Sequence, residues 1–185
     1  MARITIPYAV ADFIDLRERV FYYVDKTDYI PKLEDYNAPV FLRPRRFGKS
    51  LLLSTLEAYF SGKKDLFNGL AMETLEKEWA VYPVLHIDFS VSKYMTAEAL
   101  SAVINYQLLQ WEKLYGREEG ETTFSLRFEG IIRRAYKQTG KQVVVLIDEY
   151  DSPMLDSNHN DEVQKEIRNI CLLYTSPSPR DSTSS

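Results

Sequence analysis

The stretch APVFLRPRRFGKSLLLSTLEAYF, Ala38–Phe60, places three arginines and Gly-Lys-Ser between two apolar segments. Val40–Arg43 follows a proline and predicts a short buried strand, and Leu51–Phe60 predicts a helix that stops at Ser61-Gly62. Positive charge at a strand-to-helix turn indicates that a strongly negative group binds there. The order strand, loop, helix is typical of a phosphate-binding loop, in which N–H groups at the helix N-terminus surround phosphate oxygens.

In this interpretation Gly48 lets the backbone approach the phosphates, Lys49 reaches the terminal phosphates, and the Ser50 hydroxyl binds Mg²⁺. The usual pattern has a glycine five residues before Gly48, where this chain has Arg43. Gly-Lys-Ser by itself is also compatible with a basic turn that binds nothing. The residues predicted to contact nucleotide are Arg43, Pro44, Arg45, Arg46, Phe47, Gly48, Lys49, Ser50 and Leu51.

A second motif, VVVLIDEYD, ends another apolar segment: Gln142–Ile147 predicts a buried strand, and Asp148 and Glu149 follow it. We expect Asp148 to hold Mg²⁺, through water, and Glu149 to activate the attacking water, which makes Glu149 and Lys49 the predicted catalytic residues. An acidic strand end alone would be equally compatible with a structural role. The two motifs together, each behind its own apolar strand, predict an ATP- and Mg²⁺-binding P-loop NTPase.

The remaining elements alternate between strand and helix. Tyr82–Phe89 predicts a strand, residues 96–115 and Phe124–Lys137 predict helices, and Gly116–Thr123 predicts the loop between them. Alternation of this kind is typical of a mostly parallel sheet with crossover helices. We therefore expect an α/β fold, specifically the three-layer sandwich of P-loop NTPases.

Composition narrows the classes of partner. The 185 residues are 45% hydrophobic with a net charge of -4, which argues against broad binding to nucleic acid or to an anionic membrane. No apolar run approaches the roughly 20 residues that cross a bilayer, so we expect a cytoplasmic protein without a membrane partner. Trp79 and Trp111 are predicted to lie in the core, and His86 and His159 are assigned no chemistry because neither has a metal-ligating neighbour at useful spacing.

The C-terminal segment CLLYTSPSPRDSTSS, Cys171–Ser185, departs abruptly in composition from the chain before it. It is compatible with a disordered Ser/Pro linker, but Cys171–Asp181 resembles the translation of a transposase mosaic end with its sequencing adapter. We therefore expect residues 1–170 to be an incomplete domain and residues 171–185 to be a non-native tail. The sheet would then lack a strand, and this fragment alone would not hydrolyse ATP.

Five segments together resemble the predicted AAA-ATPase family of bacteria, which is related to archaeal-type P-loop ATPases. They are YYVDKTDYI (Tyr22–Ile30), FLRPRRFGKSLLLSTLEAYF (Phe41–Phe60), LFNGL (Leu66–Leu70), YPVLHIDFS (Tyr82–Ser90) and LIDEYDSPM (Leu146–Met154). Arginine in place of the first glycine is the usual form in this family. The resemblance implies an ATPase module that is often joined to a C-terminal nuclease-like domain, and it leaves the oligomeric state open.

For several residues the sequence allows two interpretations. Tyr23, Val24 and Asp25 are candidates for contact with adenine, or Asp25 or Thr27 caps a packed helix. Asp88 and Asp151 could lie near Mg²⁺ or could be structural carboxylates. The protein could hydrolyse ATP, could be a nucleotide-gated regulatory module with little turnover, or could use its loop arginines on nucleic acid, which the overall charge disfavours.

Overall fold

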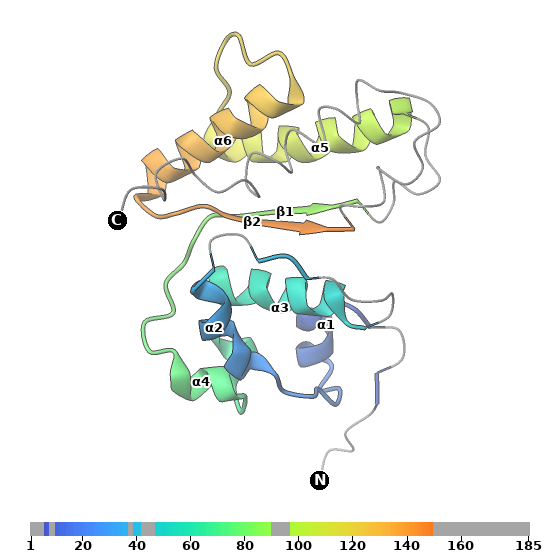
Figure 1. The fold of residues 1–185 in the computed structure, drawn as a ribbon, viewed down its shortest axis with the longest axis vertical. Coiled ribbons are helices and arrows are strands. Elements are labelled where there is room, and N and C mark those ends of the chain that lie inside the picture. Colours follow the sequence, from blue (N-terminus) through green and yellow to red (C-terminus); the bar gives the residue numbers. More distant parts are fainter. Residues whose placement is uncertain (1–5, 8–9, 37–38, 42–46, 90–96, 150–185) are drawn as a thin grey trace, which may run out of the picture. The chain divides into compact units, whose positions relative to one another are not determined.

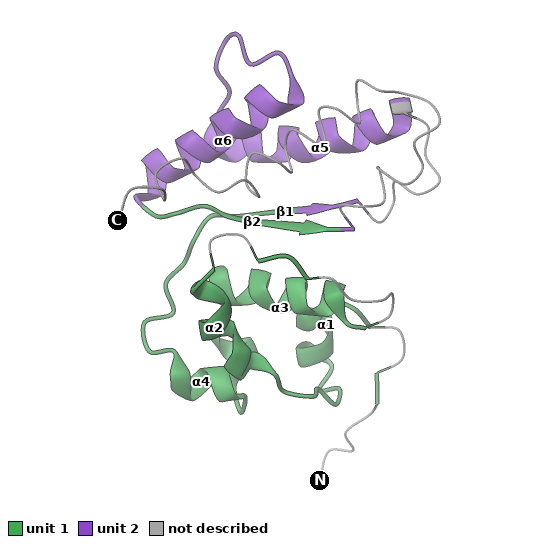
Figure 2. Ribbon diagram, in the orientation of Figure 1, with its two compact units in different colours: residues 1–86, 141–148 green, residues 87–140, 149–185 purple. Residues whose placement is uncertain are grey.

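The computed structural model describes residues 6–7, 10–36, 39–41, 47–89 and 97–149 (Figure 1). The chain divides into two compact units (Figure 2): unit 1 comprises Met1–His86 and Lys141–Asp148, and unit 2 comprises Ile87–Gly140 and Glu149–Ser185. Among the described residues no helix is both long and apolar enough to cross a membrane.

The described strands are β1 (Val84–Asp88) and β2 (Val144–Asp148), which pair in a small sheet. Their arrows point the same way in Figure 1, so the sheet is parallel. At its start, the Val144 N–H donates to the Pro83 carbonyl over 2.9 Å. Both strands confirm the predictions made from the apolar runs, and the mixture of helices with a parallel sheet confirms an α/β fold.

The structure does not show the strand that was predicted before the basic loop, in the part of it that is described. Val40 and Phe41 have no strand assignment and Val40 is exposed, while Leu42 and Arg43 lie outside the described residues. A strand is defined by ladder hydrogen bonds to a neighbouring segment, and an apolar sequence by itself does not supply that neighbour. The prediction of a buried strand is therefore wrong for the two residues of it that the structure describes.

Unit 1 is built around an aromatic core. Helix α1 (Phe13–Glu18) begins at Asp12, whose side chain accepts from the Asp15 N–H, and it buries Phe13. Phe13 packs on Phe67 of the 3₁₀ helix η2 (Lys64–Phe67) at 5.0 Å between ring centroids, and Trp79 also packs on Phe67, with the same distance of 5.0 Å. Trp79 thus belongs to the core, as predicted.

Unit 1 also contains three short helices, η1 (Thr27–Tyr29), α2 (Ile30–Glu34) and α4 (Ala71–Leu75). Asp25 joins η1 to α4. Its carboxylate accepts from the Thr27 N–H at 2.9 Å and from the Ala71 N–H at 2.7 Å, and the Thr27 hydroxyl in turn accepts from the Met72 N–H. Asp25 therefore has a structural role next to the first residues of η1 and α4, although Lys26 and Leu70 are the N-cap residues of those helices.

Unit 2 contains the helices α5 (Ala97–Tyr115) and α6 (Phe124–Thr139), which pack on each other. Thr123 caps α6 by accepting from the Leu126 N–H, and Gly140 ends it in a left-handed conformation, so the predicted helix is confirmed with two more residues. Trp111 packs on the fully buried Phe128 with 5.9 Å between their ring centroids, in the predicted core.

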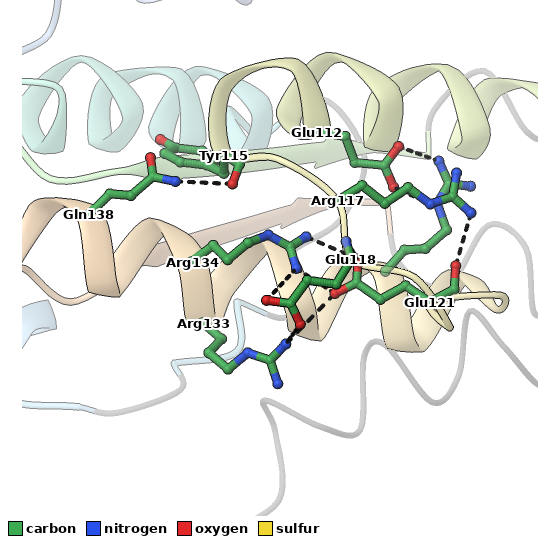
Figure 3. A network of polar contacts seen from close by, with 9 residues as sticks. Glu112, Tyr115, Arg117, Glu118, Glu121, Arg133, Arg134 and Gln138 are labelled. Atoms are coloured by element: carbon green, nitrogen blue, oxygen red, sulfur yellow. Dashed lines mark hydrogen bonds and ion pairs between the residues drawn. The ribbon is translucent and has the colours of Figure 1, made fainter.

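Ion pairs are buried between these two helices and their connecting loop (Figure 3). Arg127 of α6 donates twice to Glu112 of α5, at 2.7 and 3.0 Å, and Arg134 donates twice to Glu121 of the loop, at 2.5 and 3.0 Å. The hydrogen bond from Arg134 and its charge lower the pKa of Glu121, although burial opposes this effect. Bidentate geometry is what lets a buried pair offset the desolvation of its charges.

Candidate functional site

The Gly-Lys-Ser motif lies where the sequence predicts, at the start of α3 (Lys49–Phe60). Gly48 is the N-cap with φ 75° and ψ 24°, a left-handed conformation that residues with a Cβ adopt only with strain. The first N–H groups of a helix have no carbonyl partner within it, and Gly48 has no side chain that could accept from them. The first turn of α3 therefore presents N–H donors and the positive end of the helix dipole together.

The other end of α3 is fixed close to the start of the strands. The Tyr82 N–H donates to the Phe60 carbonyl at 2.8 Å, and the next residue, Pro83, accepts from Val144 at the start of β2. Helix α3 packs along β2, with Leu56 and Leu146 in one core cluster. Twelve helical residues span about 18 Å and five strand residues about 16 Å, so the first turn of α3 reaches the carboxyl end of β2, as the ribbon in Figure 1 shows.

Asp148 is the last residue of β2 and is only 5% exposed. Glu149 follows with φ 53°, a left-handed conformation that is uncommon for a residue with a side chain and that turns the chain at the strand end. Within unit 1 the structure thus brings Gly48, Lys49, Ser50 and Asp148 to one end of α3 and β2. Glu149 immediately follows Asp148 in the chain.

These groups fit Mg²⁺ rather than a transition metal. A serine hydroxyl and a carboxylate are hard oxygen ligands, and Mg²⁺ is commonly held by one or two protein oxygens together with phosphate oxygens and water. In the described part of the chain no group of three His, Cys, Asp or Glu side chains is placed to hold a metal ion by itself.

The remaining predicted residues are placed only in part. Arg43, Pro44, Arg45 and Arg46 lie outside the described residues, as do Asp151 and His159. Phe47 is exposed, and Leu51 packs against the core of unit 1. Among the adenine candidates, Tyr23 packs edge-on against Phe13 at 5.3 Å and Val24 is exposed. Asp88 is the last residue of β1.

A polar pair between α3 and β1 was not predicted from the sequence. His86 Nδ1 lies 2.8 Å from Glu57 Oε2 and links the middle of β1 to the third turn of α3. The hydrogen bond with His86 lowers the pKa of the Glu57 carboxyl, burial opposes this, and the charges of His86 and Lys63 reinforce it. The available signal was that Glu57 is the single acidic residue of an apolar helix and that His86 interrupts an apolar strand.

A second missed group surrounds Tyr59 near the end of the same helix. Its hydroxyl lies 3.1 Å from Glu34 Oε1 and 2.8 Å from Glu76 Oε2. Burial, together with the two carboxylates, raises the pKa of Tyr59, so the phenol stays protonated and can donate. These contacts tie α3 to the short helices α2 and α4, on the side away from the phosphate-binding motif.

Comparison with known proteins identifies the family of this chain. The family model described as "Predicted AAA-ATPase" matches residues 7–176. A curated protein of Azotobacter chroococcum mcd 1, described as an uncharacterized protein in the vnfD 5′ region, is 39% identical over 171 residues, which cover 91% of this chain and 33% of that protein. The chain thus spans about a third of the length of this relative. No solved structure matches. Since the family model covers most of the chain and includes both motifs, this chain belongs to the predicted AAA-ATPase family.

Proposed function

We propose that the protein binds Mg-ATP at the N-terminus of α3 and hydrolyses it, as a P-loop ATPase with the three-layer sandwich of that class. The observation that carries the proposal is the left-handed Gly48 cap followed by Lys49 and Ser50, at the end of β2 where Asp148 is buried. Membership of the predicted AAA-ATPase family supports it.

Each residue has a role in this proposal. The N–H groups of the first turn and Lys49 bind the phosphates, with Arg43, Arg45 and Arg46 of the loop adding charge. Ser50 and Asp148 would hold Mg²⁺, which when bound neutralises charge on the phosphates. Glu149 orients the attacking water and takes its proton. The water oxygen bonds to the terminal phosphorus, and the bond from that phosphorus to the oxygen of the leaving diphosphate breaks.

The test of binding is Lys49→Ala, with Lys77→Ala in an exposed segment as the matched control. Loss of a hydrogen bond to a charged group costs about 1.5–3 kcal/mol, so Lys49→Ala should weaken Mg-ATP binding about tenfold to 150-fold by calorimetry. Lys77→Ala should leave the affinity unchanged. If a folded Lys49→Ala variant binds Mg-ATP as tightly as the parent, the proposed site is wrong.

Turnover is tested separately. In the full-length protein, a single-turnover assay should show that Glu149→Gln binds Mg-ATP but hydrolyses it about 10²–10⁴-fold more slowly than the parent, the usual contribution of a general base. If the full-length parent binds Mg-ATP and no turnover is measured, the regulatory module with little turnover is the better description. Salt-sensitive binding of nucleic acid that ATP fails to displace would instead favour the nucleic-acid interpretation.

The larger organisation is also a proposal, because the chain spans about a third of its curated relative. We propose that residues 1–170 form part of the ATPase module and that a nuclease-like domain, where one is joined to it, is its partner.

A further inference from the structure

We propose that Glu57 and His86 are positioning residues for nucleotide binding: their contact holds α3 against β1 so that the first turn of α3 stays in register with the end of β2. This inference rests on the proposed function, because it concerns the helix that carries the phosphate-binding motif. Neither residue was expected to have a role from the sequence.

The pair is placed to control the direction of the helix. Glu57 lies eight residues after Lys49, about 12 Å along the helix axis, and its carboxylate meets His86 at 2.8 Å. His86 is at the centre of β1, next to the fully buried Leu85, so its backbone is fixed by the core. The exposed fractions of the two side chains, 41% for Glu57 and 24% for His86, mean that the contact is partly shielded from water.

Other contacts hold α3 at α1 and at its last residue. The Phe13 N–H donates to the Ser54 hydroxyl at 2.8 Å, which fixes the flank of α3 that faces α1. The Tyr82 N–H holds the last residue of α3, Phe60. A tilt of about 5° about Phe60 would move a first turn about 18 Å away by roughly 1.5 Å. The contact with His86 adds a hydrogen bond towards β1 that opposes such a tilt. Displacements of about 1 Å in a binding constellation can cost up to about 10²-fold.

The charges also suit this role. Glu57 is the single carboxylate on the helix that binds phosphates in the proposed function, and it would oppose an anionic ligand if left alone. The hydrogen bond with His86 lowers the pKa of Glu57, burial opposes this, and the charges of His86 and Lys63 reinforce it, so the ionised carboxylate is favoured. The carboxylate on α3 thus has a hydrogen-bond partner on β1.

The experiment compares Mg-ATP affinity, by calorimetry, with thermal stability in a set of variants. His86→Leu removes the contact, His86→Asn restores a nitrogen donor close to the position of Nδ1, and Glu57→Ala removes the contact from its more exposed side. Tyr59→Phe is the matched control, since it removes polar contacts of the same helix towards α2 and α4. We expect His86→Leu and Glu57→Ala to weaken Mg-ATP binding about tenfold. His86→Asn should bind Mg-ATP within about twofold of the parent. Tyr59→Phe should leave the affinity unchanged even where it lowers the melting temperature.

Two outcomes would overturn the inference: affinity unchanged in folded Glu57→Ala, or affinity that follows melting temperature across all variants, the control included. A purely structural role predicts the second outcome. Lys49→Ala separates this failure from failure of the proposed function. If Lys49→Ala weakens binding while Glu57→Ala does not, the pair has no positioning role; if Lys49→Ala also has no effect, the site itself is wrong.

Discussion

Substitution of Gly130 by alanine should destabilise the protein strongly, although alanine favours helices. Gly130 lies inside α6, and a Cβ built there would come within 1.8 Å of Glu121 Oε1, 2.5 Å of Glu121 Cδ and 2.9 Å of Arg134 Nη1. The Glu121 carboxylate must therefore move. Its side chain is 9% exposed and that of Arg134 is 11% exposed, so both charges would remain buried after their contact is broken.

The magnitude follows from two opposed effects. Breaking a buried ion pair costs about 3–5 kcal/mol, and replacing glycine by alanine within a helix recovers about 1 kcal/mol, which leaves a net loss of about 2–4 kcal/mol in the free energy of unfolding. Urea denaturation followed by circular dichroism would measure this difference. The loss is a large fraction of the stability of an ordinary domain, which is about 5–15 kcal/mol.

A double-mutant cycle isolates the cause. In a Glu121→Ala background the clash is removed, so Gly130→Ala should become neutral or stabilise the protein by up to about 1 kcal/mol. The effect of Gly130→Ala on the free energy of unfolding should therefore change from destabilising in the parent to neutral or stabilising in the Glu121→Ala background. The reasoning is refuted if Gly130→Ala destabilises both backgrounds equally, or if it leaves the parent unaffected.

Three further outcomes are expected. Gly48→Ala should lower the free energy of unfolding by about 1–2 kcal/mol through backbone strain, because among the described residues no atom beyond its two chain neighbours lies within 4 Å of the added Cβ. Gly48→Asn should lower it less, and equal losses in a denaturant titration would contradict this account. Thr123→Ala should lower the free energy of unfolding by about 1 kcal/mol because it removes the cap of α6. Thr122→Ala, one residue earlier, should change it little, and thermal melts in which Thr122→Ala is the less stable variant would rule out the cap. Burial raises the pKa of Asp25, but the hydrogen bonds from Thr27 and Ala71 outweigh this effect, so the pKa is lowered. The stabilisation of the folded state by the ionised Asp25 is therefore present at neutral pH and is lost on acidification. Asp25→Asn should therefore be less stable than the parent at pH 7, with a difference that shrinks below about pH 4; a difference independent of pH would contradict it.

The elements set by local chemistry were predictable from the sequence. The limits of α6 follow from a threonine cap, an apolar repeat of helical period and a terminal glycine, and each of these acts within a few residues. The run Gln142–Ile147 predicts β2 because β-branched residues favour strands. Gly-Lys-Ser marks the start of α3 because a left-handed N-cap favours glycine, so the motif and the helix boundary coincide.

Contacts between distant residues were not predictable in this way. Glu121 lies in the segment GREEGETT, whose composition predicts an exposed loop, yet it is buried because the packing of α5 on α6 brings Arg134 to it. His86 and Glu57 are 29 positions apart, and neither has a spacing that identifies the other. The sequence alone determined which residues begin and end the regular elements and which motif could bind phosphate, because those properties depend on neighbours along the chain. Tertiary structure alone decided which charges are buried and paired and how the phosphate-binding helix is held, because the partners become neighbours only when the helices and strands pack.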